Sequence, residues 1–180
     1  MYFLENYYQN VIQYDLINKF QYKTTKNLPQ LQKIVVNFGY KNSNMKILAS
    51  SLLALELITS KRGIITTSNS SHILLKIRKG NPVGCKVILK KTLMYNFFAK
   101  LLIDIFPQIK EFKEFYFKKG KKKNNTFSYK LKNTFIFLEL EQNYSLFNNI
   151  SNLNITIVTN TKTQNELLFL LQSFKLPLVY

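Results

Sequence analysis

The chain has few of the residues that build disulfides, metal sites and membrane spans. It contains one cysteine, Cys85, and one histidine, His72, which excludes an internal disulfide and a Cys/His zinc site. No apolar run reaches the roughly 18–20 residues that a bilayer-spanning helix needs. The composition therefore excludes disulfide scaffolds, zinc domains and proteins with a transmembrane helix.

Acidic residues are also scarce, with nine in the whole chain. They form no close pair on a cationic strand, where general acid–base chemistry could occur. Glu139 and Glu141 alternate along a predicted strand, which is typical of a solvated face. No glycine-rich phosphate loop precedes a helix. We find no catalytic constellation and no metal or cofactor site, and predict that the protein is not an enzyme.

Basic residues, in contrast, are abundant and clustered. Of the formal net charge of +17, residues 61–91 carry +8 and residues 113–132 carry +7. The first window holds eight basic residues and no acidic one, with two basic runs on either side of a turn that begins at Gly80. Such clustering favours a polyanionic partner, and a nucleic-acid backbone is the commonest partner of this kind.

The residue usage also indicates where the protein works. The cations are 24 lysines and two arginines, and Asn, Ile, Phe and Tyr are abundant, which indicates an AT-rich gene. The first residues pass almost directly into an amphipathic pattern and lack both an Arg/Ser-rich import leader and the apolar core of a signal peptide. We expect an organelle-encoded protein of the mitochondrial matrix, with a plastid or an AT-rich bacterium less favoured.

Hydrophobic periodicity predicts a single α+β domain over residues 1–180, with helices packed on one face of a mostly antiparallel sheet. A basic, glycine-containing loop at residues 118–125 is expected to be mobile. Helices are predicted at residues 4–20, 44–60, 93–106 and 164–174, the last opened by a capping box from Thr163 to Glu166. Strands are predicted at residues 33–39, 64–67, 73–78, 86–91, 135–140 and 153–159, with Pro82 in the turn after the third.

Three of these strands show the same alternation of apolar and polar side chains. Because neighbouring side chains of a strand point to opposite faces, each strand offers one apolar and one mostly cationic face. A lone surface lysine is ordinary, but three strands with the same bias predict an RNA-binding face, on which Asn37 is suited to hydrogen-bond a base or ribose. The predicted polar faces hold Lys33 with Asn37, Lys76 with Arg78, and Lys86 with Lys90.

Five stretches carry a resemblance to a known family, namely residues 8–20, 28–39, 76–87, 97–112 and 153–159. The most specific of them is Lys76-Ile-Arg-Lys-Gly-Asn-Pro-Val-Gly-Cys-Lys-Val87. In order and spacing, over nearly the whole chain, they resemble the family of the bacterial-type large-subunit ribosomal protein number five, which binds 5S ribosomal RNA.

The resemblance implies a structural constituent of the large ribosomal subunit, located in its central protuberance. The implied partners are 5S or 5S-like rRNA, large-subunit rRNA, P-site tRNA, a small-subunit head protein across an intersubunit bridge and other large-subunit proteins, with no membrane partner and no cofactor. Together with the charge pattern, it yields as candidate rRNA-binding residues Lys33, Asn37, Lys61, Arg62, Lys86, Lys90, Lys91, Lys121, Lys122 and Lys123. The candidate tRNA-facing loop, from Thr67 to Lys79, holds Ser71, His72, Lys76, Arg78 and Lys79.

Two features depart from the pattern of the family. The first half of the tRNA-facing loop has Thr67, Asn69, Ser70 and Leu74 where the family has several basic residues and a glycine. The tRNA contact is therefore weakened or rests on the cations that follow. The run Lys118–Lys123 stands where the family has a less charged, glycine-rich loop, and we interpret it as a compensating rRNA contact.

Other classes of function remain as alternatives to a ribosomal role. An RNA-binding accessory or modifying protein outside the ribosome would share the charge pattern. An enzyme acting on RNA would need clustered carboxylates for a metal or a cofactor loop, and neither is evident. A protein of the membrane surface would carry its lysines on one face of a helix, whereas here they lie on predicted strands and loops.

Overall fold

The computed structural model describes residues 3–40, 44–109, 115–116, 125–176 and 178–179. The chain clusters into two compact units, between which it passes four times. Unit 1 consists of Met1–Lys33, Lys90–Phe127 and Ile157–Tyr180. Unit 2 consists of Ile34–Leu89 and Ser128–Thr156.

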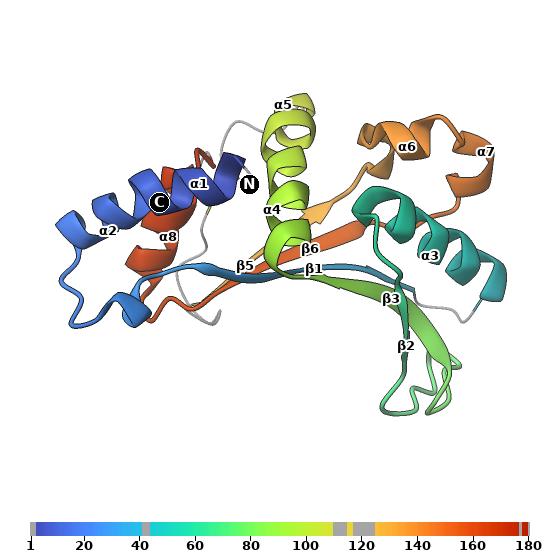
Figure 1. Ribbon diagram of the computed structural model, residues 1–180. Helices are drawn as coiled ribbons and strands as arrows, with labels where there is room; N and C mark the ends of the chain where they lie inside the picture. Colours follow the sequence, from blue (N-terminus) through green and yellow to red (C-terminus); the bar gives the residue numbers. More distant parts are fainter. Residues whose placement is uncertain (1–2, 41–43, 110–114, 117–124, 177, 180) are drawn as a thin grey trace. The chain divides into compact units, whose positions relative to one another are not determined.

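Five strands form one sheet in the order β2-β3-β1-β6-β5, and most of its residues belong to unit 2 (Figure 1). β3 is antiparallel to both β1 and β2. The strands are β1 (Leu31–Gly39), β2 (Ile64–Thr67), β3 (Pro82–Leu89), β5 (Thr126–Leu131) and β6 (Leu153–Thr159). A separate two-residue pair, β4 (Phe115–Tyr116) with β7 (Leu178–Val179), is parallel. The predicted α+β class is confirmed.

In unit 2, the period-2 alternation of β1 and β3 produces the core. Ile34, Val36 and Phe38 of β1 are buried, as are Val87 and Leu89 of β3. The helices of the unit cover this apolar face and leave the opposite face of its strands without a helix among the described residues (Figure 1). These helices are α3 (Met45–Thr59), α6 (Leu138–Glu141) and α7 (Tyr144–Phe147), with the short 3-10 helix η4 (Thr134–Ile136) before α6.

A buried polar contact also joins the sheet of unit 2 to α3. The Cys85 Sγ donates to the Ser51 Oγ at 3.2 Å, and neither residue is exposed to solvent. The residue at position 84 is a glycine, because a Cβ at this position would overlap the carbonyl oxygen of Phe38 on the neighbouring strand. Close packing inside unit 2 therefore accounts for the small residues Gly84 and Cys85 on this strand.

Unit 1 is built around aromatic side chains. The ring of Phe174 lies 5.3 Å from that of Phe98 and 6.2 Å from that of Tyr8, between centroids. The Tyr8 hydroxyl donates to the Pro29 carbonyl at 2.8 Å. The helical segments of this unit are α1 (Phe3–Tyr7), η1 (Tyr8–Ile12), α2 (Gln13–Lys19), η2 (Thr25–Asn27), α4 (Lys91–Lys100), η3 (Leu101–Ile105), α5 (Phe106–Gln108) and α8 (Gln164–Ser173).

The four helices predicted from periodicity are confirmed, with ends shifted by one or a few residues. The capping box that opens α8 is present, since the Thr163 Oγ1 accepts from the Glu166 N at 3.3 Å and Glu166 accepts from the Thr163 N at 3.2 Å. Three predicted strands are also confirmed, as β1, β2 and β6. The fourth, predicted at residues 86–91, is β3 and begins earlier, at Pro82, which stands at the first position of the strand rather than in the turn.

Two predicted strands are wrong. Residues 73–76 form a turn, and their apolar side chains meet no surface on which a strand could bury them. Residues 135–140 are helical, because the side chain of Asn133 accepts from the Phe135 N at 3.0 Å and so caps a 3-10 turn that leads into α6. Three strands are absent from the prediction, namely β5, in which Phe127 and Leu131 are buried, and the two-residue strands β4 and β7.

The single domain predicted from the sequence stays a prediction, and Cys85 provides its test. Burial raises the pKa of the Cys85 thiol, so the folded chain holds less thiolate than the unfolded chain near pH 8 and alkylation needs unit 2 to open. We expect the urea midpoint for iodoacetamide labelling of Cys85 to coincide with the midpoint of far-UV circular dichroism. Labelling that is complete at clearly lower urea would show that unit 2 unfolds separately.

Candidate nucleic-acid interface

The face of unit 2 that lies opposite its helices brings two of the predicted residues together. Asn37 of β1 and Lys86 of β3 are directly paired across the ladder, and Lys86 is paired in turn with Ile64 of β2. Asn37 and Lys86 are half-buried, and Ile64 is exposed. Directly paired residues share one face of a sheet, so an amide, an ammonium group and an apolar side chain form one row. We call these three residues the open-face row.

Three of the predicted lysines of unit 1 lie on β1 or directly after β3. Lys33 is half-buried on β1, where Lys33, Val35 and Asn37 alternate with the buried side chains. Lys90 and Lys91 follow the end of β3 and are both exposed. Lys91 has a φ of 51°, in the left-handed region that is uncommon for a residue with a side chain. The predicted alternation of β1 is therefore confirmed, whereas Lys90 lies beyond the strand on which it was expected.

Lys61 and Arg62 are exposed and follow the end of α3. The helix stops at Ser60, whose φ of 53° turns the chain out of the helical path. The Lys61 Nζ donates to the Ile88 carbonyl oxygen at 2.6 Å, which ties the segment before β2 to β3. An ammonium group has three donors, so Lys61 can hold this carbonyl and still donate to a phosphate.

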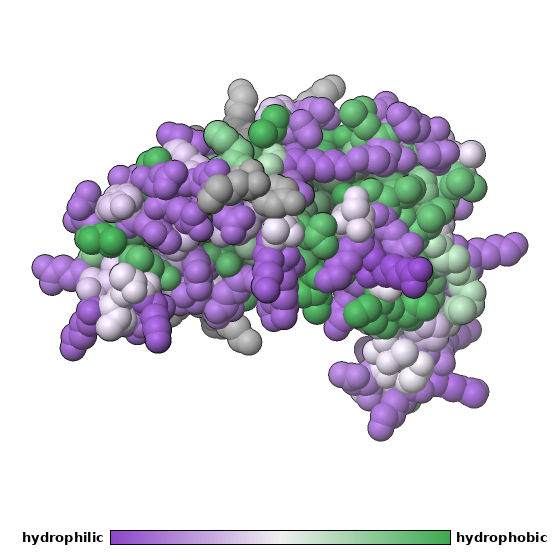
Figure 2. Space-filling view, in the orientation of Figure 1, coloured by the Kyte–Doolittle hydropathy of each residue, from purple (hydrophilic) through white to green (hydrophobic). Residues whose placement is uncertain are grey.

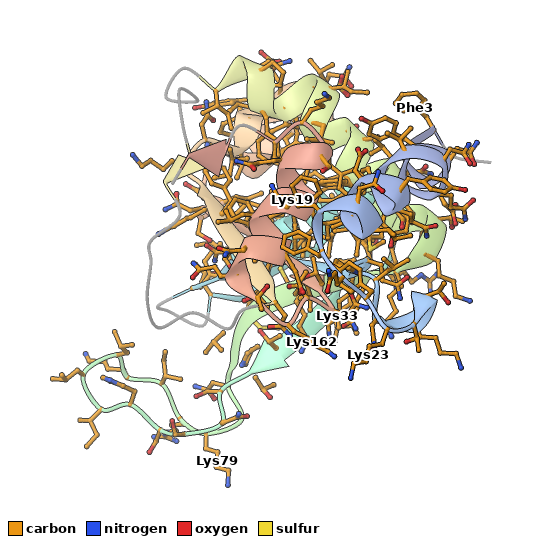
Figure 3. The ribbon with its side chains drawn as sticks, turned by 90° about the vertical axis from the view of Figure 1, so that its left-hand side faces the viewer. Phe3, Lys19, Lys23, Lys33, Lys79 and Lys162 are labelled. Atoms are coloured by element: carbon orange, nitrogen blue, oxygen red, sulfur yellow. The ribbon has the colours of Figure 1, made fainter. Side chains whose placement is uncertain are left out.

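The segment between β2 and β3 forms a projecting hairpin, residues 68–81, that is held by backbone hydrogen bonds (Figures 1 and 3). At its base, the Ser68 N donates to the Asn81 O and the Gly80 N donates to the Ser68 O, both at 2.9 Å. Further out, His72 and Ile77 exchange two bonds of 2.8 and 3.2 Å. The tip then closes at Lys76, whose φ is 53°.

This hairpin carries the five residues predicted for the tRNA-facing loop, and each of them is exposed. Lys79 points away from the hairpin in the side-chain view (Figure 3), and the space-filling view shows mainly polar surface there (Figure 2). The predicted strand face that would hold Lys76 with Arg78 is wrong, because residues 73–76 turn. The exposed loop residues are Ser71, His72, Lys76, Arg78 and Lys79.

Sequence reasoning missed that the tip itself is apolar. Ile73 and Leu74 are 92% and 89% exposed, and they lie in the four-residue turn between His72 and Ile77. The available signal was three consecutive apolar residues directly before Lys76, with no alternation that would put one side of a strand in a core. The hairpin therefore offers both cations and a small apolar tip.

The electrostatics of this surface favour an anionic ligand. Residues 61–91 contain no carboxylate, so no acidic side chain of that window neutralises the cations of β3 or the hairpin. Each cation held near a phosphate releases counterions, which favours binding at low ionic strength. The three further candidates, Lys121, Lys122 and Lys123, lie outside the described residues.

The described residues show neither of two other kinds of site. Across the ranges that the structure describes, no group of three or more His, Cys, Asp or Glu residues could hold a metal ion. Among the described helices, none is long and apolar enough to cross a membrane.

Two comparisons with known proteins identify relatives of this chain. Residues 82–178 match the family model that describes the C-terminus of the ribosomal L5 protein family. Over 177 residues, the chain is 38% identical to the protein named large ribosomal subunit protein uL5m from Reclinomonas americana, and the match covers 97% of each chain.

Substitutions in the open-face row test whether its lysine and its amide contact RNA. We expect Lys86→Gln to reduce the slope of log K against log salt by about 1, because one phosphate contact is lost. Asn37→Ala should leave the slope unchanged and weaken binding about three- to tenfold, since a hydrogen bond contributes roughly 0.5–1.5 kcal/mol. The measurement is a salt titration of the affinity for a 5S-like RNA.

The matched control is Lys46→Gln, which removes the same charge from an exposed residue of the helical layer of unit 2. It should change neither the affinity nor the slope. Equal effects of Lys46→Gln and Lys86→Gln would mean that the RNA responds to net charge and not to the open face.

Proposed function

This chain belongs to the ribosomal L5 family, and we propose on that premise that it is a structural protein of the large subunit of a mitochondrial ribosome. The similarity to a protein named as a mitochondrial large-subunit protein covers 97% of both chains, so it extends over the whole relative and not over one part of it. The role is to bind and position ribosomal RNA, and it requires no catalytic group.

The observation that carries the finer proposal is the open-face row. Lys86 supplies a charge for a phosphate, and Asn37 beside it supplies an amide that can donate to and accept from a base or a ribose. The two are adjacent on a strand pair whose other face is buried, so they are held in fixed register. We propose that this face binds 5S or 5S-like rRNA in the central protuberance.

Further rRNA contacts are proposed for the remaining cations. Lys61 and Arg62 precede β2, and Lys33, Lys90 and Lys91 lie on or beside the strands. The proposal that Lys121, Lys122 and Lys123 add a compensating contact rests on the sequence alone. Contacts to large-subunit rRNA and to other large-subunit proteins belong to the same proposal.

We propose that the hairpin contacts P-site tRNA and the small-subunit head protein of an intersubunit bridge. Its cations, Lys76, Arg78 and Lys79, suit the tRNA backbone, and Ile73 and Leu74 at the tip suit the apolar face of an unpaired or stacked base. The backbone hydrogen bonds along the hairpin support this role, because they hold the tip away from the sheet at little cost on binding.

Sedimentation tests the proposed function. A tagged chain expressed in its own organelle should co-sediment with the large subunit at physiological salt and be released together with 5S-like RNA at high salt. Recovery with membranes, or in fractions free of ribosomal RNA, would contradict the proposal.

A hairpin variant separates assembly from tRNA contact. With Lys76, Arg78 and Lys79 replaced by glutamine, we expect unchanged co-sedimentation and P-site tRNA affinity lowered by about tenfold or more, since three charged contacts are lost. The control replaces Lys19, Lys23 and Lys26 of unit 1 by glutamine, which removes the same charge elsewhere. If both triple variants lowered tRNA affinity equally, the hairpin would have no special role.

A further inference from the structure

The outer side of α3 is apolar, although nothing in the described residues covers it. Met45, Leu53 and Leu57 are 63%, 45% and 40% exposed, and Ala49 between them is exposed as well. These four residues follow one another at intervals of four along the helix, so they form a single row on its surface. We call Met45, Ala49, Leu53 and Leu57 the α3 ridge.

The opposite side of α3 is already used by the core of unit 2. Leu48, Ala54, Leu55 and Ile58 are buried there. A helix that is apolar on both sides is normally buried on both sides. The space-filling view shows apolar surface gathered over the helices of this unit (Figure 2). The exposed apolar side chains of the α3 ridge are therefore typical of a surface that a partner covers.

The charges around the ridge differ from those of the sheet. All three carboxylates of unit 2 are on α3 and α6, namely Glu56, Glu139 and Glu141. Glu56 lies three residues after Leu53 and is therefore its neighbour on the helix surface, and α6 packs against α3. The one cation on α3 is Lys46, in its first turn. The Glu56 Oε1 accepts from the Gly63 N at 3.3 Å, and its second oxygen, together with the exposed carboxylate of Glu141 on α6, can accept from basic groups of a partner.

We propose that the α3 ridge docks a basic amphipathic helix of another protein of the large subunit. A row of side chains at intervals of four fits the groove between rows on a second helix, which is the commonest packing of two helices. The partner supplies apolar residues at intervals of three and four together with lysines or arginines that face Glu56 and Glu141. RNA thus binds the sheet side of unit 2, and a protein binds its helical side.

Footprinting and crosslinking in the assembled subunit test this proposal, which rests on the proposed ribosomal role. Met45 should be oxidised readily by hydroxyl radicals in the purified chain and be protected in the large subunit. A benzophenone amino acid in place of Leu57 should crosslink to a peptide that has apolar residues at intervals of three and four and flanking lysines or arginines. An exposed Met45 in the subunit would overturn the proposal, as would crosslinks to RNA, lipid or a second copy of this chain.

A matched pair of variants measures what the ridge contributes. Leu53→Gln with Leu57→Gln should lower retention in the large subunit after a high-salt wash by about tenfold or more, because the burial of each apolar side chain contributes about one decade of affinity. The control, Ile17→Gln with Ile103→Gln, changes two exposed apolar residues of unit 1. Equal retention of the two variants would overturn the proposal.

The same measurements on the large subunit separate a failure of this proposal from a failure of the proposed function. If the unchanged chain does not sediment with the large subunit, the ribosomal role fails. If it sediments there while Met45 remains exposed, the ribosomal role stands and the docking of a helix on α3 fails. Both ridge substitutions are at exposed positions, and unchanged affinity for 5S-like RNA shows that the variant is folded.

Discussion

The antiparallel pairing of β1 with β3 is the constraint on which the arrangement of unit 2 depends. The register joins Phe38 to Cys85 on the buried face and Asn37 to Lys86 on the open face. A shift of one residue would move every apolar side chain of β1 to solvent and every polar one into the core. The close approach at Gly84 and the Cys85–Ser51 hydrogen bond secure this register, so the packing of the core also positions Asn37 and Lys86, the side chains proposed to bind RNA.

Local periodicity predicted the elements whose burial follows directly from their own pattern. The helices, β1 and β6 were predictable because their apolar side chains recur at helical or strand spacing and do reach the core. The pairing of Asn37 with Lys86 was not predictable, since it depends on the register between strands that are distant in the sequence. The shared polar face was expected, but not which residues lie opposite each other.

The errors have identifiable physical causes. Residues 73–76 have strand-forming composition, yet the β2–β3 ladder places them at the tip of a hairpin, where no surface can bury them. Residues 135–140 also have the pattern of a strand, but the side chain of Asn133 caps a helical turn at this point. Phe137 is buried even though it follows a helical turn and does not lie in a strand. In both cases, tertiary context and a local hydrogen bond override the propensity of the side chains.

The separation of charge between the two sides of unit 2 is the basis for proposing an RNA contact on one side and a protein contact on the other. Its strands and hairpin carry cations without carboxylates over residues 61–91, whereas its acidic residues lie on α3 and α6. The side without carboxylates attracts phosphate more strongly than the helical side does. In the proposed role, this difference would orient the chain on its RNA before any specific contact forms and would leave the helical side for neighbouring proteins.

The most direct test of the central claim is ultraviolet crosslinking of the tagged chain in its own organelle, with sequencing of the RNA and mapping of the crosslinked peptides. If the open face binds ribosomal RNA, the reads will be concentrated on one 5S-like or large-subunit RNA, and the crosslinked peptides will come from β1 and β3 and contain Asn37 and Lys86. Reads scattered over messenger RNA, or crosslinked peptides confined to the helices of unit 2, would contradict it.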